Sequence, residues 1–207
     1  MFTDTHCHIY NEYYDNDIEQ VYEKMKVVNV NRIINNGCDS KSNKEVLDLL
    51  GKYSWMYGAI GIHPESADTE TLEDLKFIEE HINDEKVVAI GEIGLDYYWN
   101  KENKELQKEL FIKQIELANK LDLPIVIHTR DAVMDTLEIL KNITPCNKKG
   151  IFHCCPLNVE LIKEEQLQRI ENLIDSVISI AKISGISKEE IPKDVAMDCP
   201  NRSPAKR

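Results

Sequence analysis

The sequence lacks the features that would point to a membrane, secreted or disulfide-linked protein. No apolar run among its 207 residues approaches the roughly 18 residues that a membrane-spanning helix needs. Residues 1–8 contain neither the basic stretch nor the apolar stretch of a secretory signal. The six cysteines include no Cys-x-x-Cys pair, which disfavours a structural zinc site and a disulfide framework. We therefore expect a cytoplasmic protein with no membrane partner.

Positive charge is also scarce, because 25 Lys and Arg residues stand against 37 Asp and Glu residues, for a formal net charge of −12. A protein that binds nucleic acid through its own charge is usually basic, since it gains affinity by displacing counterions from phosphates. If this chain binds nucleic acid, another group must supply positive charge at the phosphates. The hydrophobic fraction of 42% and the charged fraction of 30% are typical of a globular chain, here with one core.

Short apolar segments rich in Val and Ile alternate with amphipathic segments along the first three quarters of the chain. The pattern predicts strands at 2–8, 32–37, 55–62, 87–94, 124–128 and 150–153, and helices at 17–28, 42–52, 72–83, 101–121 and 132–141. Strands such as Ile125-Val126-Ile127 are apolar throughout, which indicates parallel strands covered on both faces. The fold class is therefore α/β.

Two α/β architectures remain open at this point, a doubly wound open sheet and a closed barrel. No Gly-x-Gly-x-x-Gly follows the first strand, which weakens the open-sheet interpretation. Polar residues stand at the C-terminal ends of five strands, as they do where a (β/α)8 barrel builds its site. We expect a TIM (β/α)8-type barrel, incomplete because only about six strands are recognisable. Residues 1–158 would form it, followed by C-terminal helices at 159–191 and a flexible tail at 192–207.

The first candidate site is the segment Asp-Thr-His-Cys-His at residues 4–8. Residues two apart on a strand project to the same side, so His6 and His8 can bind one divalent cation together, with Asp4 orienting an imidazole. Two histidines at a strand end can equally be hydrogen-bonded surface residues. Three further strand ends favour the metal site, because Glu92, His128 and His153 would converge with His6 and His8 in a barrel.

These five residues are enough for a pair of divalent ions, with Glu92 bridging them through its two carboxylate oxygens. Two such ions activate a shared water and stabilise both oxygens in a displacement at phosphorus. The ions would also supply the positive charge that the chain lacks. Arg130, two residues after His128, would add a guanidinium fork for a phosphate.

Several of these segments resemble, in order, the signatures of the TatD family of metal-dependent deoxyribonucleases. They are Asp-Thr-His-Cys-His at 4–8, Gly-Ile-His-Pro at 61–64, Gly-Glu-Ile-Gly-Leu-Asp-Tyr-Tyr at 91–98, Leu-Pro-Ile-Val-Ile-His-Thr-Arg at 123–130 and Phe-His-Cys at 152–154. The resemblance implies a TIM barrel of the metal-dependent hydrolase kind, two divalent ions (magnesium, manganese or zinc) and phosphodiester hydrolysis on DNA as substrate. It also implies that His6 and His8 hold one ion, that His128 and His153 hold the other, and that Glu92 lies between them.

Two other segments of the resemblance allow a functional and a structural interpretation. His63 could contact the substrate phosphate, or its side chain could simply bond the backbone of the turn before Pro64. Tyr97, Tyr98 and Trp99 form an aromatic loop that could stack an unpaired base. Packing over the barrel rim is the expected role of at least one of the three.

The resemblance breaks after the sixth strand. The family continues with two further strands, the last ending in Glu-Thr-Asp-x-Pro, and we expect that stretch to be missing near residues 167–175. Asp198-Cys199-Pro200 resembles the lost Asp-x-Pro but follows no apolar strand, so Asp198 is expected to lie in a solvated turn rather than to bind metal. An open barrel also exposes the edges of its first and sixth strands, which predicts self-association unless residues 159–183 cover the gap.

Two other functions stay open. An amidohydrolase that cleaves a cyclic amide shares the His-x-His of the first strand but often bridges its metals with a carboxylated lysine, where this chain has Glu92. The altered C-terminus also allows a catalytically dead remnant that still binds metal.

Overall fold

The structure is a computed structural model, and it describes residues 1–15, 17–70, 72–143, 148 and 150–153. The expected C-terminal helices, the expected tail and Asp198 lie outside these residues. The strands are β1 (Phe2–Cys7), β2 (Val30–Asn36), β3 (Met56–Ile60), β4 (Val87–Asp96), β5 (Ile125–Arg130) and β6 (Ile151–His153). The helices are α1 (Ile18–Val27), α2 (Ser40–Lys52), α3 (Leu72–His81), α4 (Lys104–Leu121) and α5 (Val133–Asn142), with short 3-10 turns η1 (Asn11–Tyr13) and η2 (Pro64–Ser66).

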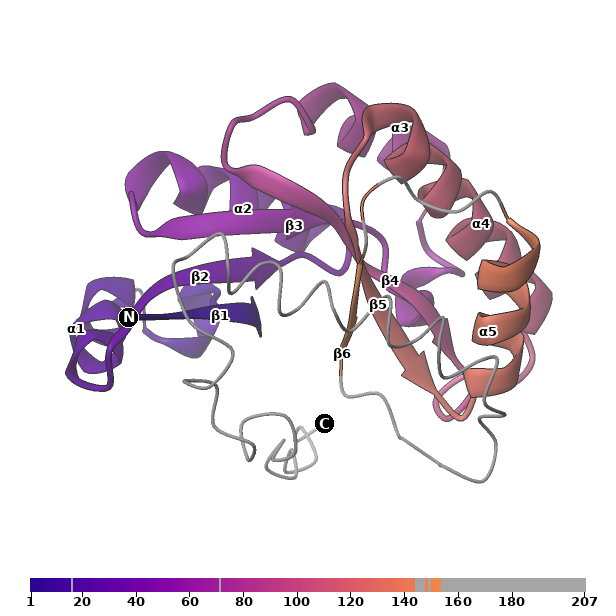
Figure 1. Cartoon of the computed structure of the whole chain (residues 1–207), viewed down its shortest axis with the longest axis horizontal. Coiled ribbons are helices and arrows are strands. Elements are labelled where there is room, and N and C mark those ends of the chain that lie inside the picture. The colour runs from indigo at the N-terminus through magenta and orange to yellow at the C-terminus, as the bar shows by residue number, and fades with distance from the viewer. Residues whose placement is uncertain (16, 71, 144–147, 149, 154–207) are drawn as a thin grey trace.

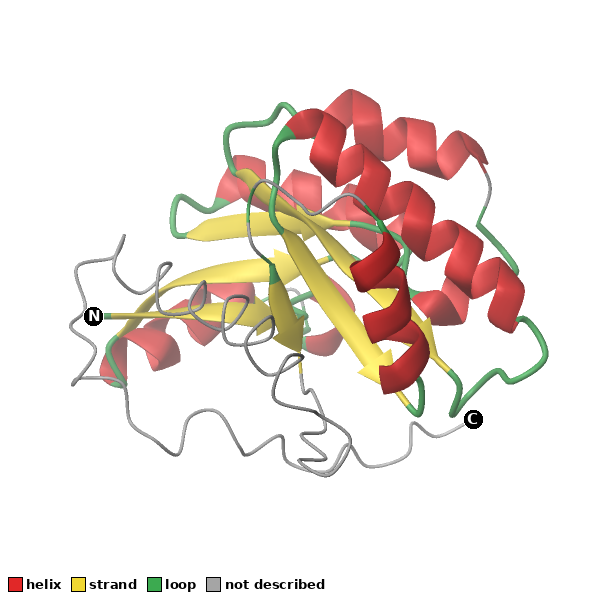
Figure 2. Cartoon of the chain, turned by 45° about the vertical axis from the view of Figure 1, so that its right-hand side comes forward, coloured by secondary structure: helices red, strands yellow, loops and turns green. Residues whose placement is uncertain are grey.

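All six strands are parallel and follow one another in the order β1-β2-β3-β4-β5-β6. The sheet curls into a nearly closed barrel with the helices on its outer side (Figures 1 and 2). The expected α/β barrel with about six strands is therefore confirmed. In the described part of the chain, no helix is long and apolar enough to cross a membrane.

Neighbouring residues of a strand are buried on opposite faces of the sheet. Ile33, Ile60 and Ile90 belong to the large core under the helices, which Phe111 of α4 also joins. The residues beside them form a second cluster on the inner face: Ile34, Ala59, Ala89 and Val126. Because a parallel strand alternates its side chains between two covered faces, both faces must be apolar, as the continuous apolar runs predicted.

Several boundaries differ from the sequence prediction for local reasons. Helix α2 begins at Ser40 rather than residue 42, because Asp39 caps it by accepting from the Ser42 backbone N–H at 2.7 Å while Ser42 bonds back. Strand β4 continues to Asp96 rather than stopping at Gly94, since Gly94, Leu95 and Asp96 pair with His128, Thr129 and Arg130 of β5. This extension carries Asp96 into the same end of the barrel as His128.

Buried carboxamides fix the chain at the C-terminal ends of β3 and β4. Asn43 of α2 accepts from the backbone N–H of Gly61 and donates to its carbonyl. Gln114 of α4 does the same for Ile62, and Gln107 of α4 does the same for Asp96. A buried backbone group without a partner costs about 1–3 kcal/mol, so these amides hold the strand ends in one position. His63 follows directly after two of these anchored residues.

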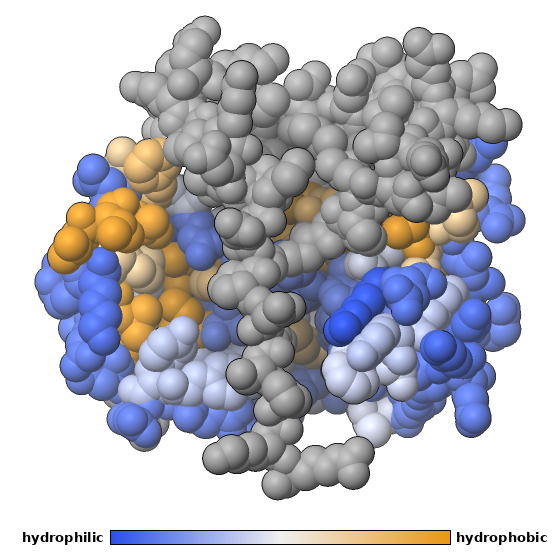
Figure 3. Space-filling model, turned by 90° about the horizontal axis from the view of Figure 1, so that it is seen from below, coloured by the Kyte–Doolittle hydropathy of each residue, from blue (hydrophilic) through white to orange (hydrophobic). Residues whose placement is uncertain are grey.

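Polar and charged residues cover most of the described surface on one face of the molecule, with apolar residues gathered toward one side (Figure 3). Four of the large exposed hydrophobic residues belong to β1, the end of α1 and their flanks: Met1, Phe2, Val27 and Val28. The self-association expected from exposed strand edges stays a prediction, because residues 159–183 lie outside the described part.

Candidate metal centre

The candidate site is built around Glu92 of β4, which is 3% exposed. Its Oε2 lies 3.1 Å from Nε2 of His6 on β1 and 3.3 Å from Nε2 of His8, the residue after β1. Its Oε1 lies 3.1 Å from Nδ1 of His128 on β5. The β4–β5 register shifts between Ile90 and Ile93, and the Gly91–Glu92 peptide bond within that stretch is cis. Imidazoles from two other strands therefore meet one carboxylate inside the barrel mouth.

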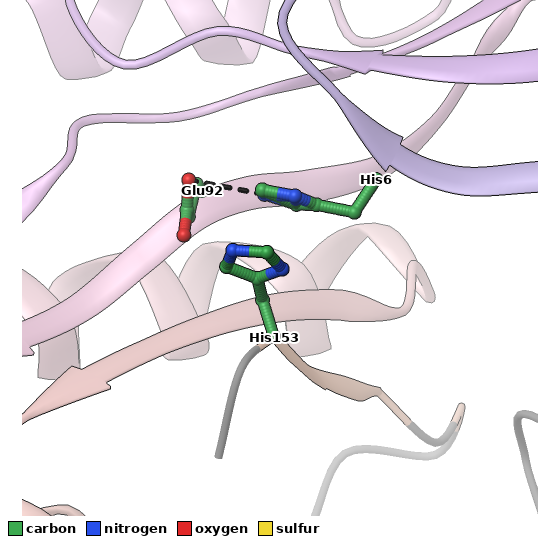
Figure 4. Close-up of side chains that lie close together, drawn as sticks. All are labelled: His6, Glu92 and His153. Atoms are coloured by element: carbon green, nitrogen blue, oxygen red, sulfur yellow. Dashed lines mark ion pairs between the residues drawn. The ribbon is translucent and has the colours of Figure 1, made fainter. Parts of the chain in front are cut away.

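His153 at the end of β6 completes this group from the other edge of the sheet. Its ring stacks on that of His6 with the centroids 3.5 Å apart and the planes 18° apart. Figure 4 shows His6, Glu92 and His153 projecting toward one another from β1, β4 and β6. Strands β1 and β6 thus approach each other at the site, although they are not hydrogen-bonded neighbours in the part of the sheet that the structure describes.

The ligand atoms near Glu92 fall into three groups, and all three share its carboxylate. Within each group these atoms lie within 4.8 Å of one another: His6 with His153, His8 with Cys38, and His63 with His128. The structure thus brings all five expected ligands together. It groups them differently from the sequence expectation, which placed His6 with His8 and His128 with His153. The assignment of these ligands to one ion or the other stays a prediction.

His8 is held in one tautomer by a contact that the sequence did not indicate. Its Nδ1 lies 2.9 Å from the backbone carbonyl oxygen of Asn36, which can only accept, so Nδ1 carries the proton. The Tyr10 hydroxyl lies 3.3 Å from the same nitrogen and itself donates to that carbonyl. Nε2 of His8 therefore presents a lone pair toward Glu92, as a metal ligand must.

Cys38 lies two residues after β2 and is not among the site residues expected from the sequence. Its Sγ lies 3.8 Å from Nδ1 of His8, on the side away from the Glu92 contact. A position just after a predicted strand was the only signal that could have found it.

His128 is bound by carboxylates through both ring nitrogens. Nδ1 faces Glu92, and Nε2 lies 2.9 Å from Oδ2 of Asp96, which is 1% exposed. Burial alone would lower the pKa of His128, but its hydrogen bonds to Asp96 and Glu92 raise that pKa to about 9. Asp96 belongs to the motif at 91–98 but is not among the site residues expected from the sequence. The signal was present, since an Asp follows a predicted strand by two residues.

His63 follows β3 and is buried beside His128, with their ring centroids 4.3 Å apart. Its Nδ1 accepts a hydrogen bond from the backbone N–H of Glu65 at 3.2 Å, as the structural interpretation of the turn before Pro64 proposed. Burial, followed by the charge of His128, lowers the pKa of His63 to about 4. A neutral His63 with Nδ1 accepting must carry its proton on Nε2, so it is a hydrogen-bond donor on that side.

Protonation in the rest of the cluster suits metal binding. Burial would raise the pKa of Glu92, but its hydrogen bond from His128 and the other imidazoles around it hold that pKa well below the ordinary value. Burial and the charge of His153 lower the pKa of His6 to about 3. Glu92 is therefore ionised and His6 neutral at pH 7, as metal ligands must be, whereas His128 would release a proton on binding an ion.

Nε2 of His6 gives an independent test of whether a cation fits. It is buried and makes no hydrogen bond of good geometry, although it lies 3.1 Å from Glu92 Oε2. Two atoms that each bind one ion at about 2.1 Å stand about 3 Å apart, so this spacing suits a shared ion. A buried polar atom without a hydrogen bond normally marks strain or a missing partner. The donors present thus fit a divalent cation.

Arg130 and the aromatic loop lie at the rim of the site. Arg130 is exposed at the end of β5, and its Cζ lies 3.8 Å from the ring centroid of Tyr98. Tyr97 is buried, whereas Tyr98 is 49% and Trp99 is 64% exposed. Tyr97 is therefore the residue that packs over the rim, and the rings of Tyr98 and Trp99 face solvent. His81 lies exposed on α3, away from the cluster.

Comparison with known proteins decides the family. A family model described as TatD related DNase matches residues 3–203. The chain belongs to the TatD family. The resemblance found in the motifs over residues 1–158 is confirmed, and the match continues beyond them.

Relatives of this TatD protein carry similar names. YabD of Bacillus subtilis (strain 168), named an uncharacterized metal-dependent hydrolase, is 40% identical over 209 residues, which cover 99% of this chain and 82% of YabD. YcfH of Escherichia coli (strain K12), with the same kind of name, is 34% identical over 74% of this chain and 58% of its own length. TATDN3 of Mus musculus, whose name proposes a deoxyribonuclease, is 31% identical over 67% of this chain and 51% of its own length.

Solved structures agree on the fold. The crystal structure of YJJV, a TatD homolog from Escherichia coli k12, superposes with a TM-score of 0.73 at 28% identity, covering 81% of this chain and 64% of YJJV. A TatD family hydrolase from Entamoeba histolytica superposes with a TM-score of 0.68 at 26% identity, covering 83% of this chain and 62% of that hydrolase. The chain spans less than two thirds of YcfH, TATDN3 and both of these structures. The deletion expected near residues 167–175 does not show as a long gap in the YabD match, which pairs 99% of this chain over 209 residues.

Proposed function

We propose that this TatD protein is a divalent-metal-dependent phosphodiesterase that hydrolyses DNA. The observation that carries the proposal is the convergence of His6, His8 and His128 on the buried, ionised carboxylate of Glu92. The name of YabD supports metal-dependent hydrolysis, and the name of TATDN3 proposes a deoxyribonuclease. The net charge of −12 fits a site whose positive charge comes from bound cations.

The residues that would hold two divalent ions are His6, His8, Glu92, His128 and His153, with Glu92 shared between them. Bound there, such ions would lower the pKa of a water and stabilise negative charge on the phosphate. Magnesium, manganese and zinc are the candidates, since imidazole and carboxylate donors accept all three. Asp96 orients His128 from the opposite side, as carboxylates commonly do behind metal-binding histidines.

The protein's own residues would position the phosphate. His63 carries a proton on Nε2 and is fixed by the Glu65 N–H, so it would donate a hydrogen bond to a phosphate oxygen. Arg130 is charged at all pH values of interest and would bind a phosphate through its planar fork. These roles make Glu92, His63 and Arg130 the proposed catalytic residues. A cytoplasmic location stays a prediction, and so does the expectation that Asp198 does not bind metal.

The test is hydrolysis of a single-stranded oligonucleotide by purified protein with magnesium, manganese or zinc, compared with the Glu92→Gln variant. Gln keeps the shape of Glu92 but removes its charge, so we expect the rate to fall at least about 100-fold. Glu116→Gln is the matched control, because it makes the same change on the exposed face of α4. Equal cleavage by wild type and Glu92→Gln would refute the proposal, as would no cleavage with any of the three metals.

A further inference from the structure

Three planar groups lie together on the rim beside the metal centre. Arg130 Cζ is 3.8 Å from the centroid of Tyr98 and 5.5 Å from that of Trp99. The rings of Tyr98 and Trp99 meet edge to face with centroids 4.8 Å apart. Arg130 thus occupies one face of Tyr98, and Trp99, at 64% exposure, presents most of its surface to solvent. We call these three residues the rim platform.

The rim platform is anchored to the metal centre by a single carboxylate. Oδ1 of Asp96 accepts from the backbone N–H groups of Tyr98 and Trp99 at 2.9 and 3.1 Å, while Oδ2 contacts His128. The loop is also tied down by Tyr97, whose hydroxyl donates to Asp135 at 2.7 Å. The position of the exposed rings is therefore fixed relative to the proposed reacting phosphate.

The charge of Arg130 is available to a ligand. In the part of the chain that the structure describes, no carboxylate forms an ion pair with its guanidinium, in a protein with a large acidic excess. Stacking on an aromatic face leaves the N–H groups at the edge of the guanidinium free to bind a phosphate. An exposed tryptophan offers a π-face on which any base can stack.

We infer that the rim platform binds one unpaired nucleotide, with its base on Trp99 and its phosphate on Arg130, so that the enzyme selects single-stranded DNA or frayed ends over duplex. The inference rests on the proposed function for its reacting phosphate. A base inside a duplex has both faces covered by its neighbours and cannot stack on Trp99 unless it leaves the helix. Selection for single strands then needs no base-specific hydrogen bond.

The test separates the base from the phosphate. Binding of a fluorescent twelve-residue oligothymidylate, an abasic strand of equal length and a duplex is measured by anisotropy in the non-cleaving Glu92→Gln background. Trp99→Leu should raise the Kd for oligothymidylate at least about fivefold, since stacking one base contributes about 1–3 kcal/mol. Trp99→Phe keeps a flat ring and should stay within about twofold. The Kd values for the abasic strand and the duplex should not change with either variant.

The controls keep failure of the subsite distinct from failure of the reaction. Val27→Ala, an exposed apolar residue at the far end of α1, should change no Kd. If Trp99→Leu binds oligothymidylate as tightly as the parent, or weakens abasic and normal strands equally, the subsite is refuted even where wild type cleaves DNA. If binding depends on Trp99 as stated but wild type cleaves nothing, the reaction is refuted and the subsite stands. No binding of any strand refutes the subsite.

Discussion

Asp96 holds His128 from the side opposite Glu92, with Oδ2 of Asp96 2.9 Å from Nε2 of His128 and Oε1 of Glu92 3.1 Å from Nδ1. One imidazole is thus shared by two buried carboxylates. Burial would raise the pKa of Asp96, but its hydrogen bond to His128 and those from the loop backbone lower it. The pair links the metal centre to the rim platform.

Replacing Asp96 with Asn should weaken metal binding with little effect on folding. The amide oxygen of Asn can still accept from the loop N–H groups, but the charge that orients His128 is lost. Loss of such an orienting carboxylate typically reduces metal affinity about 10–100-fold. Calorimetric titration with manganese measures it, with Asp48→Asn on the exposed face of α2 as control. Unchanged affinity in Asp96→Asn would show that His128 needs no partner behind it.

His63→Gln should slow the reaction without loss of metal. Its Nε2–H is proposed to donate to the phosphate, and its Nδ1 is already occupied by the Glu65 backbone. Removal of such a donor commonly lowers kcat about 10–1000-fold. Steady-state kinetics and manganese titration of the same sample separate the two effects, and His81→Gln on α3 is the control. Should the variant lose an ion instead, His63 would be a ligand in the group that it forms with Glu92 and His128.

Gly94 is required at its position by both backbone conformation and space. Its φ is +143°, and a Cβ there would lie 2.0 Å from the backbone oxygen of His128. Gly94→Ala should therefore reduce the free energy of unfolding by about 2–4 kcal/mol through strain and overpacking. Urea denaturation measures this. Gly51→Ala is the matched control, since nothing lies within 4 Å of its added Cβ. In that helix the change should raise the free energy of unfolding by about 0.5–1 kcal/mol. Equal effects of the two changes would contradict the geometry.

Asp135 should make the stability of the protein depend on pH in acid. Lys108 lies 2.8 Å from its Oδ2 and the Tyr97 hydroxyl 2.7 Å, and these contacts lower the pKa of Asp135 below the ordinary 3.8. A depressed pKa contributes stability that is present above the ordinary value and is lost as pH falls through the folded value. Asp135→Asn should therefore cost about 1 kcal/mol at pH 7, because the ion pair is partly exposed.

The pH series decides that prediction. Urea unfolding of wild type and Asp135→Asn is compared at pH 7, 5 and 3.5, and the difference between them should shrink at the lowest pH. A difference that stays constant over the series would mean that the variant acts through packing of Tyr97 rather than through charge.

The sequence allowed prediction of the barrel and of the residues that meet at its mouth, because strand ends can be read from apolar segments. His6, Glu92, His128 and His153 all lie in the C-terminal half of such segments. The partners of each imidazole could not be assigned, since they depend on the β4–β5 register shift near Glu92 and on the stacking of β6 against β1. Neither the register shift nor the stacking can be predicted from the spacing of apolar residues in the sequence.

Contacts that orient the ligands were missed for a related reason. The carbonyl of Asn36 fixes the tautomer of His8, and a backbone carbonyl has no sequence signature. Asp96 stands two residues past the predicted end of its strand, and only the longer β4 of the structure shows that its side chain reaches His128. The position at which β4 ends thus decides whether Asp96 is taken as a loop residue or as part of the site.

The most direct test of the account is a crystal structure of the protein grown with manganese, using the anomalous signal of the metal. We predict anomalous peaks within about 2.3 Å of the Glu92 carboxylate, with Nε2 of His6 and Nε2 of His8 among the ligands. Peaks only at surface carboxylates, with Glu92 still bonded directly to its histidines, would contradict the central claim.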